Sequence, residues 1–223
     1  MDLTQTTELT LERMARILET HGPERTAVAW SGGKDSTVVM ALWRETLVRA
    51  GRDERPKAVS VDTGLKFPDV LAFRDRMAEI WGVKVYVARP DPIPPEYPVA
   101  EDPVTCCRDL KIVPLESCLK SEGILALLTG VRHDEHPARL DIPWQENRHG
   151  VVRAHVIHHW TEMDIWAFVV QEKLAYCPLY DQGYRSLGCR PCTALISGEG
   201  SERLGRSQAK ESKMEELRSL GYF

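Results

Sequence analysis

The chain has 223 residues, 43% of them hydrophobic and 28% charged, which is enough for one domain with a sizeable core. Its formal net charge of -4 argues against independent nucleic-acid binding, which depends on clustered positive charge. No stretch approaches the roughly 18 uninterrupted apolar residues of a membrane span, and the N-terminus lacks a basic and apolar secretion signal, so we expect a cytoplasmic protein without a membrane segment.

Apolar runs alternate with amphipathic segments along most of the chain. In chain order, the pattern predicts a helix over 7–19, a strand over 26–30, a helix over 36–49, a strand over 57–61, a helix over 68–81, a strand over 84–88, a helix over 108–121, strands over 124–129 and 151–155, and helices over 161–173 and 208–220. This alternation predicts an α/β fold, a doubly wound parallel sheet covered by helices on both faces.

We expect a single domain over residues 1–223, with a loop-rich tail over 174–223. The proline-rich stretch 89–103 is too long for a simple connection, which favours a functional loop or a crossover.

A glycine turn joins the first predicted strand to the next helix. Gly32 and Gly33 leave room for backbone amides to face a phosphate, and the helix that follows directs its positive dipole end to the same anion. Lys34 adds a positive charge, while Ser31 and Ser36 add hydroxyl donors. A plain turn without a ligand is the alternative, and the spacing of a Walker A loop is absent.

The run Ser31–Ser36 resembles the signature of the PP-loop ATP pyrophosphatases, the adenine nucleotide alpha-hydrolase-like group with a Rossmann-like sheet. Val61–Gly64 and Gly130–Arg132 resemble the later strand ends of its branch that contains sulfonucleotide reductases and the ATP sulfurylase small subunit. Asp62 could instead cap a turn. The resemblance implies a nucleotide site formed by Ser31, Gly32, Gly33, Lys34, Asp35, Ser36, Asp62 and Gly130.

Six cysteines are the strongest feature of the composition. Cys106 and Cys107 are adjacent, and Cys189 and Cys192 form a C-x-x-C pair. Four thiolates can bind zinc or an iron–sulfur cluster, and two adjacent cysteines suit the larger 4Fe–4S cluster better than one small ion. A thioredoxin-like redox pair or inert buried cysteines are the alternatives, and we expect the latter for the two other cysteines, Cys118 and Cys177.

The second half of the chain resembles the cluster-bearing assimilatory reductases of sulfonucleotides. The resemblance rests on the cysteine pair with Lys111, on residues 183–193, on the segment 160–166 and on Gly205–Arg206. It implies that Cys106, Cys107, Cys189 and Cys192 bind the cluster. Two features depart from that family: no cysteine follows Cys192, where those reductases carry a catalytic one, and the phosphate turn is intact rather than degenerate.

These departures favour an ATP pyrophosphatase that keeps a reductase-like cluster, as in bacterial DNA phosphorothioation. It would split ATP into AMP and pyrophosphate while adenylylating an acceptor, with Lys34, Asp35 and Arg132 as catalytic residues and Mg²⁺ sharing the charge. A cysteine desulfurase and other modification proteins are the expected partners. DNA would be presented through them, and a homo-oligomer is possible.

Three alternatives stay open. They are an APS or PAPS reductase that produces sulfite, an ATP sulfurylase small subunit, and a cluster-bearing nucleotide sensor without activity. The reductase would need a nucleophile from Cys118, Cys177 or another chain.

Several cations and histidines are further candidates. Arg132, His133, Arg139, Arg148 and Arg153 could grip phosphates or simply form surface ion pairs. For His155, His158 and His159, a surface or capping role is favoured over metal binding.

Overall fold

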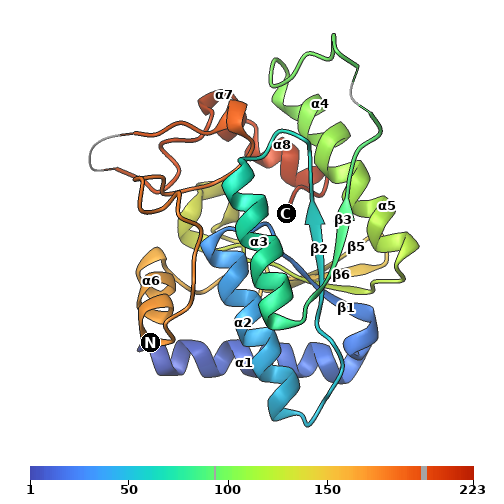
Figure 1. Cartoon of the computed structure of the whole chain (residues 1–223), viewed down its shortest axis with the longest axis vertical. Coiled ribbons are helices and arrows are strands. Elements are labelled where there is room, and N and C mark those ends of the chain that lie inside the picture. Colours follow the sequence, from blue (N-terminus) through green and yellow to red (C-terminus); the bar gives the residue numbers. More distant parts are fainter. Residues whose placement is uncertain (93, 197–199) are drawn as a thin grey trace.

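The computed structural model describes residues 1–92, 94–196 and 200–223. Its centre is a six-stranded sheet in the order β3-β2-β1-β4-β6-β5 (Figure 1). The strands are β1 (Thr26–Ala29), β2 (Lys57–Val61), β3 (Lys84–Ala88), β4 (Ala126–Leu128), β5 (Gln145–Arg148) and β6 (Val151–Ala154). All neighbouring pairs are parallel except β5 with β6, which is antiparallel. The predicted α/β fold with a mostly parallel sheet is confirmed.

Helices cover both faces of the sheet. They are α1 (Leu3–His21), α2 (Lys34–Arg49), α3 (Pro68–Trp81), α4 (Pro103–Cys107), α5 (Val113–Ser121), α6 (Glu162–Gln171), α7 (Gln208–Glu211) and α8 (Met214–Ser219). Among the helices of the described residues, none has the length and apolarity needed to cross a bilayer.

The two cores follow from the alternation of side chains along β1. Val28 faces the larger core, formed with α1, α2, α3 and α6, whereas Ala27 faces a smaller core formed with α5. Local signals place the helix ends. Asp2 accepts a hydrogen bond from the Gln5 amide at the start of α1, and Gly82 ends α3 in the left-handed conformation.

Strand β5 was not predicted. Its sequence, Gln145–Arg148, is entirely polar, and an edge strand tolerates this because only one of its sides pairs with a neighbour. The helix predicted over 208–220 is instead two short helices, α7 and α8. In the cysteine region, α4 runs through a wide π-helical turn over Arg108–Ile112 into α5.

The tail beyond residue 174 crosses the carboxyl end of the sheet. Helices α7 and α8 both contact α4, and the three lie together at the end to which β2 and β3 point in Figure 1. A third apolar cluster joins Met214 and Leu217 of α8 to Cys107 and Val131. The tail therefore forms one wall of the space above the strand ends.

Candidate active site

The site lies where the sheet reverses its winding. Strands β1 and β4 are parallel neighbours, but the chain continues from β1 to β2 on one side, while β4 is followed in space by β6 on the other. In open parallel sheets ligands bind in the crevice at such a point. A cavity of about 280 Å³ lies there, lined by the turn after β1, the end of β4, the π-helical region and the tail.

The glycine turn has the conformation that its sequence requires. Gly32 has a φ of 85°, and a Cβ at this position would lie 2.8 Å from the Val70 carbonyl oxygen. The Oγ atoms of Ser31 and Ser36 are 3.1 Å apart, and the Lys34 amide donates to the Tyr180 hydroxyl over 2.9 Å. Ser31, Gly33, Asp35 and Ser36 line the cavity, so helix α2 directs its N-terminus toward it.

Lys34 and Arg132 lie behind this wall rather than in it. Their side chains are 1% and 0% exposed, and the carboxylate of Glu202 contacts both of them. Asp35 accepts from Lys34 over 3.0 Å and from Arg132 over 2.7 Å, while Asp134 accepts from Arg132 over 2.6 Å. The three predicted catalytic residues are thus brought together, but the tail residue Glu202 neutralises the two cations.

The other predicted nucleotide residues lie at neighbouring strand ends. Gly130 packs so closely on α2 that a Cβ would lie 2.9 Å from the Ser36 nitrogen. Asp62 follows β2, accepts from the Gly64 amide over 3.1 Å and pairs with Arg89 over 3.2 Å. Burial opposes ionisation of Asp62, but these contacts outweigh it and lower its pKa. Asp62 therefore also shapes a turn, the alternative raised from the sequence.

Unpaired cations also line the cavity, and one of them, Lys66, reaches the Ser31 carbonyl oxygen of the glycine turn, 3.5 Å away. Lys66, Lys111, Arg153 and Arg206 line the cavity, and within the described parts of the chain none of them makes an ion pair with a carboxylate. The Nε atoms of Arg153 and Arg206 are buried without a hydrogen-bond partner. Burial and the charge of Lys111 lower the pKa of Lys66 to about 8. Buried cations without a partner are unfavourable, so an anionic ligand would stabilise this arrangement.

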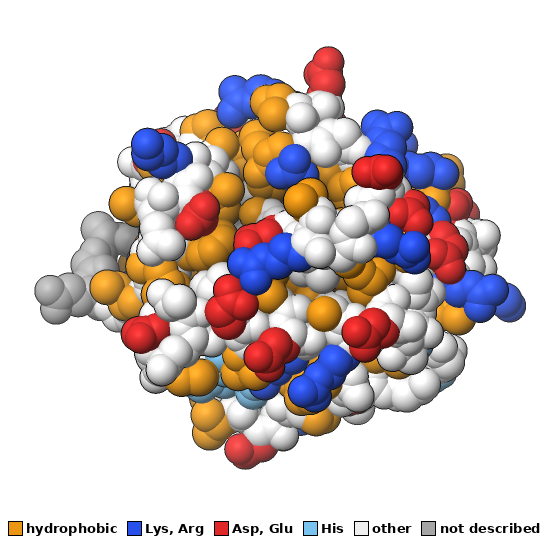
Figure 2. All heavy atoms as spheres, turned by 90° about the horizontal axis from the view of Figure 1, so that it is seen from below, with side chains coloured by type: hydrophobic (Ala, Val, Ile, Leu, Met, Phe, Trp, Pro, Cys, Tyr) orange, Lys and Arg blue, Asp and Glu red, His pale blue; other side chains and the backbone are white. Residues whose placement is uncertain are grey.

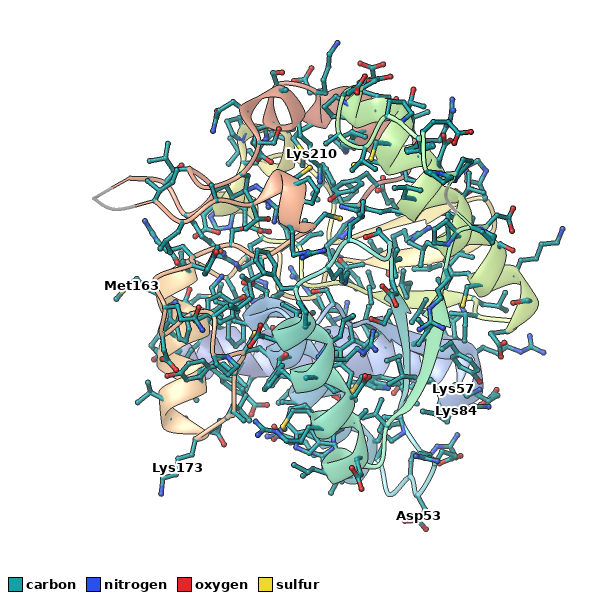
Figure 3. The ribbon with its side chains drawn as sticks, turned by 45° about the horizontal axis from the view of Figure 1, so that its top comes forward. Asp53, Lys57, Lys84, Met163, Lys173 and Lys210 are labelled. Atoms are coloured by element: carbon teal, nitrogen blue, oxygen red, sulfur yellow. The ribbon has the colours of Figure 1, made fainter. Side chains whose placement is uncertain are left out.

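Cys189 lies among these cations. Burial opposes ionisation of its thiol, yet the charge of Lys111 and the Thr63 hydroxyl, 3.3 Å away, outweigh burial and lower the pKa of Cys189. Lys210 turns from α7 into the same interior, whereas Lys57 and Lys84 lie at the far end of the sheet (Figure 3). The cationic environment thus favours negative charge on sulfur.

The four predicted cluster cysteines are all buried and free of disulfides. Burial raises the pKa of the Cys106 thiol, and the neighbouring thiols of Cys107 and Cys192 act in the same direction. Among the described residues, no three histidine, cysteine or acidic side chains are close enough to hold a single metal ion. Burial and the neighbouring lysines suit an anionic group such as a cluster, and the ligand set stays a prediction.

The tail also closes the cavity. Tyr222 lines it, and its hydroxyl lies 3.4 Å from the Lys111 Nζ atom and also contacts Lys210. Burial favours the neutral phenol, but the two lysines lower the pKa of Tyr222 to about 7. Phe223 lies under the Arg139 guanidinium, 4.6 Å from ring centroid to carbon. The tail residues thus supply part of the anion-binding surface.

Of the remaining candidates from the sequence, some line the cavity and others lie outside it. Arg139 and Arg153 line the cavity, but Arg139 already pairs with Glu135. Arg148 pairs with Glu146 on the edge strand and lies outside the cavity lining. Each of the four candidate histidines makes a hydrogen bond within the fold. The contacts are His133 to the His158 carbonyl, His155 to Thr129, His158 to the Arg139 carbonyl, and His159 to Arg13 and the Thr6 carbonyl.

Sequence reasoning missed Glu202, Lys66, Tyr180 and Tyr222. Glu202 contacts Lys34 across 168 positions, a separation that no local pattern reveals. Arg206 and Lys111 were noted only as parts of a motif. Lys111 is four residues after Cys107, and Arg206 follows the C-x-x-C pair in the tail. These positions could have suggested cations beside the cysteines.

Known proteins match this arrangement over most of the chain. The family profile described as the phosphoadenosine phosphosulfate reductase domain matches residues 25–195. The chain belongs to this reductase family. It is 36% identical over 163 residues to the adenosine 5'-phosphosulfate reductase of Deinococcus radiodurans, covering 70% of this chain and 64% of the relative. It is 30% identical over 227 aligned positions to the phosphoadenosine 5'-phosphosulfate reductase of Gloeobacter violaceus, covering 91% of both.

Solved structures share the fold at low identity. A phosphoadenylyl-sulfate reductase from Candida auris superposes with a TM-score of 0.67 at 18% identity, covering 83% of this chain and 90% of that one. The FMN adenylyltransferase of Candida glabrata, in complex with FMN and an ATP analogue, gives 0.68 at 17%, covering 94% and 75%. The U34-tRNA thiolase NcsA of Methanococcus maripaludis, with its [4Fe-4S] cluster, gives 0.64 at 14%, covering 98% and 75%.

The relatives correct the main function expected from the sequence. We expected an ATP pyrophosphatase of DNA phosphorothioation and kept the APS or PAPS reductase as the alternative. Relatives of this reductase-family chain at 30–36% identity are named as reductases, so the main expectation is wrong and the alternative is favoured. The physical reason is that an intact glycine turn does not show whether its lysine is free, and Lys34 is neutralised by Glu202.

Proposed function

We propose that the chain is a sulfonucleotide reductase, which converts an adenosine 5'-phosphosulfate-type substrate into AMP and sulfite. One observation carries the proposal: unpaired cations line the cavity, with Lys66 and Lys111 beside Cys189, whereas Lys34 at the glycine turn is neutralised. Arg153 and Arg206 are the other two unpaired cations of the lining. A sulfonate group beside these cations would compensate their charges. The reductase names of the relatives support the same substrate class.

In the proposed reaction, a thiolate attacks the sulfur of the sulfonate group. The bond between sulfur and the bridging phosphate oxygen breaks, AMP leaves with the electron pair, and a thiosulfonate forms on the attacking sulfur. A second thiol then displaces sulfite and leaves a disulfide. Arg206 and Lys111 would hold the sulfonate and offset its charge, as preorganised cations do in anion transfer.

The attacking thiol is proposed to come from a dithiol protein of the thioredoxin class. Cys118, on α5, packs against the smaller core, and Cys177 is 0% exposed in the larger core. Neither lines the cavity. Cys189 does, but we assign it to the cluster. The cavity is therefore proposed to present the substrate's sulfur to a reductant that arrives from solution.

We also propose that Cys106, Cys107, Cys189 and Cys192 hold a 4Fe–4S cluster. All four are buried, and Lys111 and Lys210 lie beside Cys107 and Cys189 to offset thiolate charge. When bound, the cluster would supply a fixed negative group that ties the tail to α4 and orders the lysines. The Mg²⁺ and the desulfurase partner expected for ATP chemistry are not part of this proposal.

The test uses the anaerobically purified, cluster-loaded chain with reduced thioredoxin. We expect sulfite and AMP in equal amounts from adenosine 5'-phosphosulfate, or sulfite and adenosine 3',5'-bisphosphate in equal amounts from its 3'-phosphorylated form. Arg206→Ala should weaken substrate binding about tenfold or more, since it removes a charge-assisted contact. Lys57→Ala, at the far end of the sheet, is the control. No sulfite from either nucleotide, under conditions in which the protein is folded and loaded, would overturn the proposal.

A further inference from the structure

The sequence poses a contradiction that the structure can resolve. The glycine turn Ser31–Ser36 is complete enough to predict the binding of a nucleoside triphosphate, yet the chain belongs to a reductase family. A triphosphate needs a free lysine and free amides at such a turn. What occupies the turn is therefore decisive for which nucleotide can enter.

Glu202 takes up the charged groups that a phosphate at the glycine turn would need. One of its carboxylate oxygens contacts the Lys34 ammonium and the other contacts the Arg132 guanidinium. Lys34 begins α2 directly after the glycine turn, and Arg132 follows the end of β4, so Glu202 bridges the two central strand ends. A carboxylate held by two cations in this way has the charge and donor pattern of a bound phosphate oxygen pair.

Within this buried cluster the carboxylates outnumber the cations. Lys34 and Arg132 supply two positive charges, while Asp35, Asp134 and Glu202 supply three negative ones. Glu202 is 9% exposed and both cations are less exposed still, so solvent screens these charges only weakly. A pyrophosphate group could use Lys34 only after Glu202 had moved away.

The tail anchors Glu202 from both sides. Before it, the carbonyl of Gly200 accepts a 2.6 Å hydrogen bond from Arg185. After it, Arg203 pairs with Glu211 over 2.7 Å. Arg206, three residues further on, reaches the cavity. The same short segment therefore holds Glu202 against Lys34 and supplies a cation to the cavity lining.

We propose that Glu202 determines specificity by excluding the β- and γ-phosphates of ATP from the glycine turn, so that the site takes adenosine ligands with a single 5'-phosphate, with or without a sulfonate on it. The inference rests on the proposed function for the identity of the substrate. It goes beyond that function in assigning the rejection of ATP to one carboxylate. It also explains how an intact turn can serve in a reductase.

Calorimetric titration with AMP, ADP, ATP and adenosine 5'-phosphosulfate tests this, using the cluster-loaded protein. The wild type should bind ATP no more tightly than AMP. Glu202→Ala should bind ATP about tenfold more tightly or better, because Lys34 is released for a charge-assisted contact, while its affinity for AMP stays the same. Adding Lys34→Ala to Glu202→Ala should remove the gain. Glu216→Ala, an exposed acid of the same tail, is the matched control.

Glu202→Gln keeps the shape of the side chain without its charge and should give a gain of the same sign if the alanine variant fails to fold. ATP binding by the wild type well above that of AMP would overturn the inference, as would folded variants without a gain. Failure of sulfite production together with a gain in ATP affinity would refute the proposed function and leave the role of Glu202 standing. Sulfite production without the gain would do the reverse.

Discussion

Arg132 donates a 2.7 Å hydrogen bond from Nε to the Oδ1 atom of Asp35, and this contact ties the loop after β4 to the first turn of α2. The two residues come from the two neighbouring strands at which the sheet reverses. Acidic and basic side chains are interspersed on the face of the molecule seen in Figure 2, but at the site they are buried, where each pair affects stability more strongly.

Removing Asp35 should therefore destabilise the fold. Asp35→Ala takes one partner from two buried cations that keep Glu202, and we expect the free energy of unfolding to fall by about 1–3 kcal/mol in urea denaturation. Glu8→Ala removes a pair with Arg49 whose side chains are 52% and 51% exposed, and should cost less than about 1 kcal/mol. Equal losses in the two variants would contradict the importance of the buried network.

Gly130 should not tolerate even one methyl group. A Cβ there would meet the backbone of α2, 2.9 Å from the Ser36 nitrogen and 3.1 Å from the Asp35 carbonyl carbon, so Gly130→Ala must push the strand end away from the helix. We expect a loss of about 1–3 kcal/mol in the free energy of unfolding, with weaker AMP binding.

Gly33→Ala is the comparison for this prediction. Its Cβ would meet only the hydroxyls of Ser31 and Tyr180, at 3.3 and 3.4 Å, and its backbone is already extended. It should lower the stability by less than about 1 kcal/mol. A Gly130→Ala protein as stable as Gly33→Ala would show that β4 and α2 are less closely packed.

His159 should make stability depend on pH. It accepts from Arg13 over 2.8 Å and donates to the Thr6 carbonyl over 3.1 Å, and burial lowers its pKa to about 4, compared with about 6.5 in the unfolded chain. Between about pH 4 and pH 6.5, His159 is therefore protonated in the unfolded state but neutral in the folded state. The contribution is complete above about pH 6.5 and is lost as the pH falls towards 4.

His159→Gln should flatten this part of the pH profile. Its free energy of unfolding should fall less steeply than that of the wild type, by up to about 1.4 kcal/mol per pH unit, in urea denaturation at several pH values between about 4 and 7. His149→Gln, at a side chain that is 77% exposed, should keep the wild-type slope. Identical slopes in all three proteins would mean that His159 takes up its proton over the same pH range in the folded and the unfolded state.

The proposed 4Fe–4S cluster predicts the metal content of the protein. Anaerobically reconstituted protein should contain about four iron and four sulfide ions per chain. Serine at any one of Cys106, Cys107, Cys189 or Cys192 should reduce the iron content and the visible absorption. Cys118→Ser, on the half-buried face of α5, should leave both unchanged. One zinc ion per chain in place of iron would contradict the assignment.

The sequence alone predicted the α/β architecture, because the hydrophobic patterns of buried strands and amphipathic helices are visible in short stretches of sequence. Strands β2 and β3 and helix α3 have the predicted bounds. It also located the glycine turn, because Gly32 adopts a φ of 85° that glycine reaches without steric cost. The polar strand β5 was missed, because a strand without an apolar face is defined only by its pairing with β6.

What the glycine turn can bind was decided only by the tertiary structure. The sequence shows a lysine and a glycine pair but not the carboxylate that reaches Lys34 from 168 positions away, because charge neutralisation depends on distance in space. The same holds for the unpaired cations that line the cavity, which come from four separate segments of the chain. Local periodicity therefore determined the elements and the turn, whereas long-range electrostatics decided which anion the site favours.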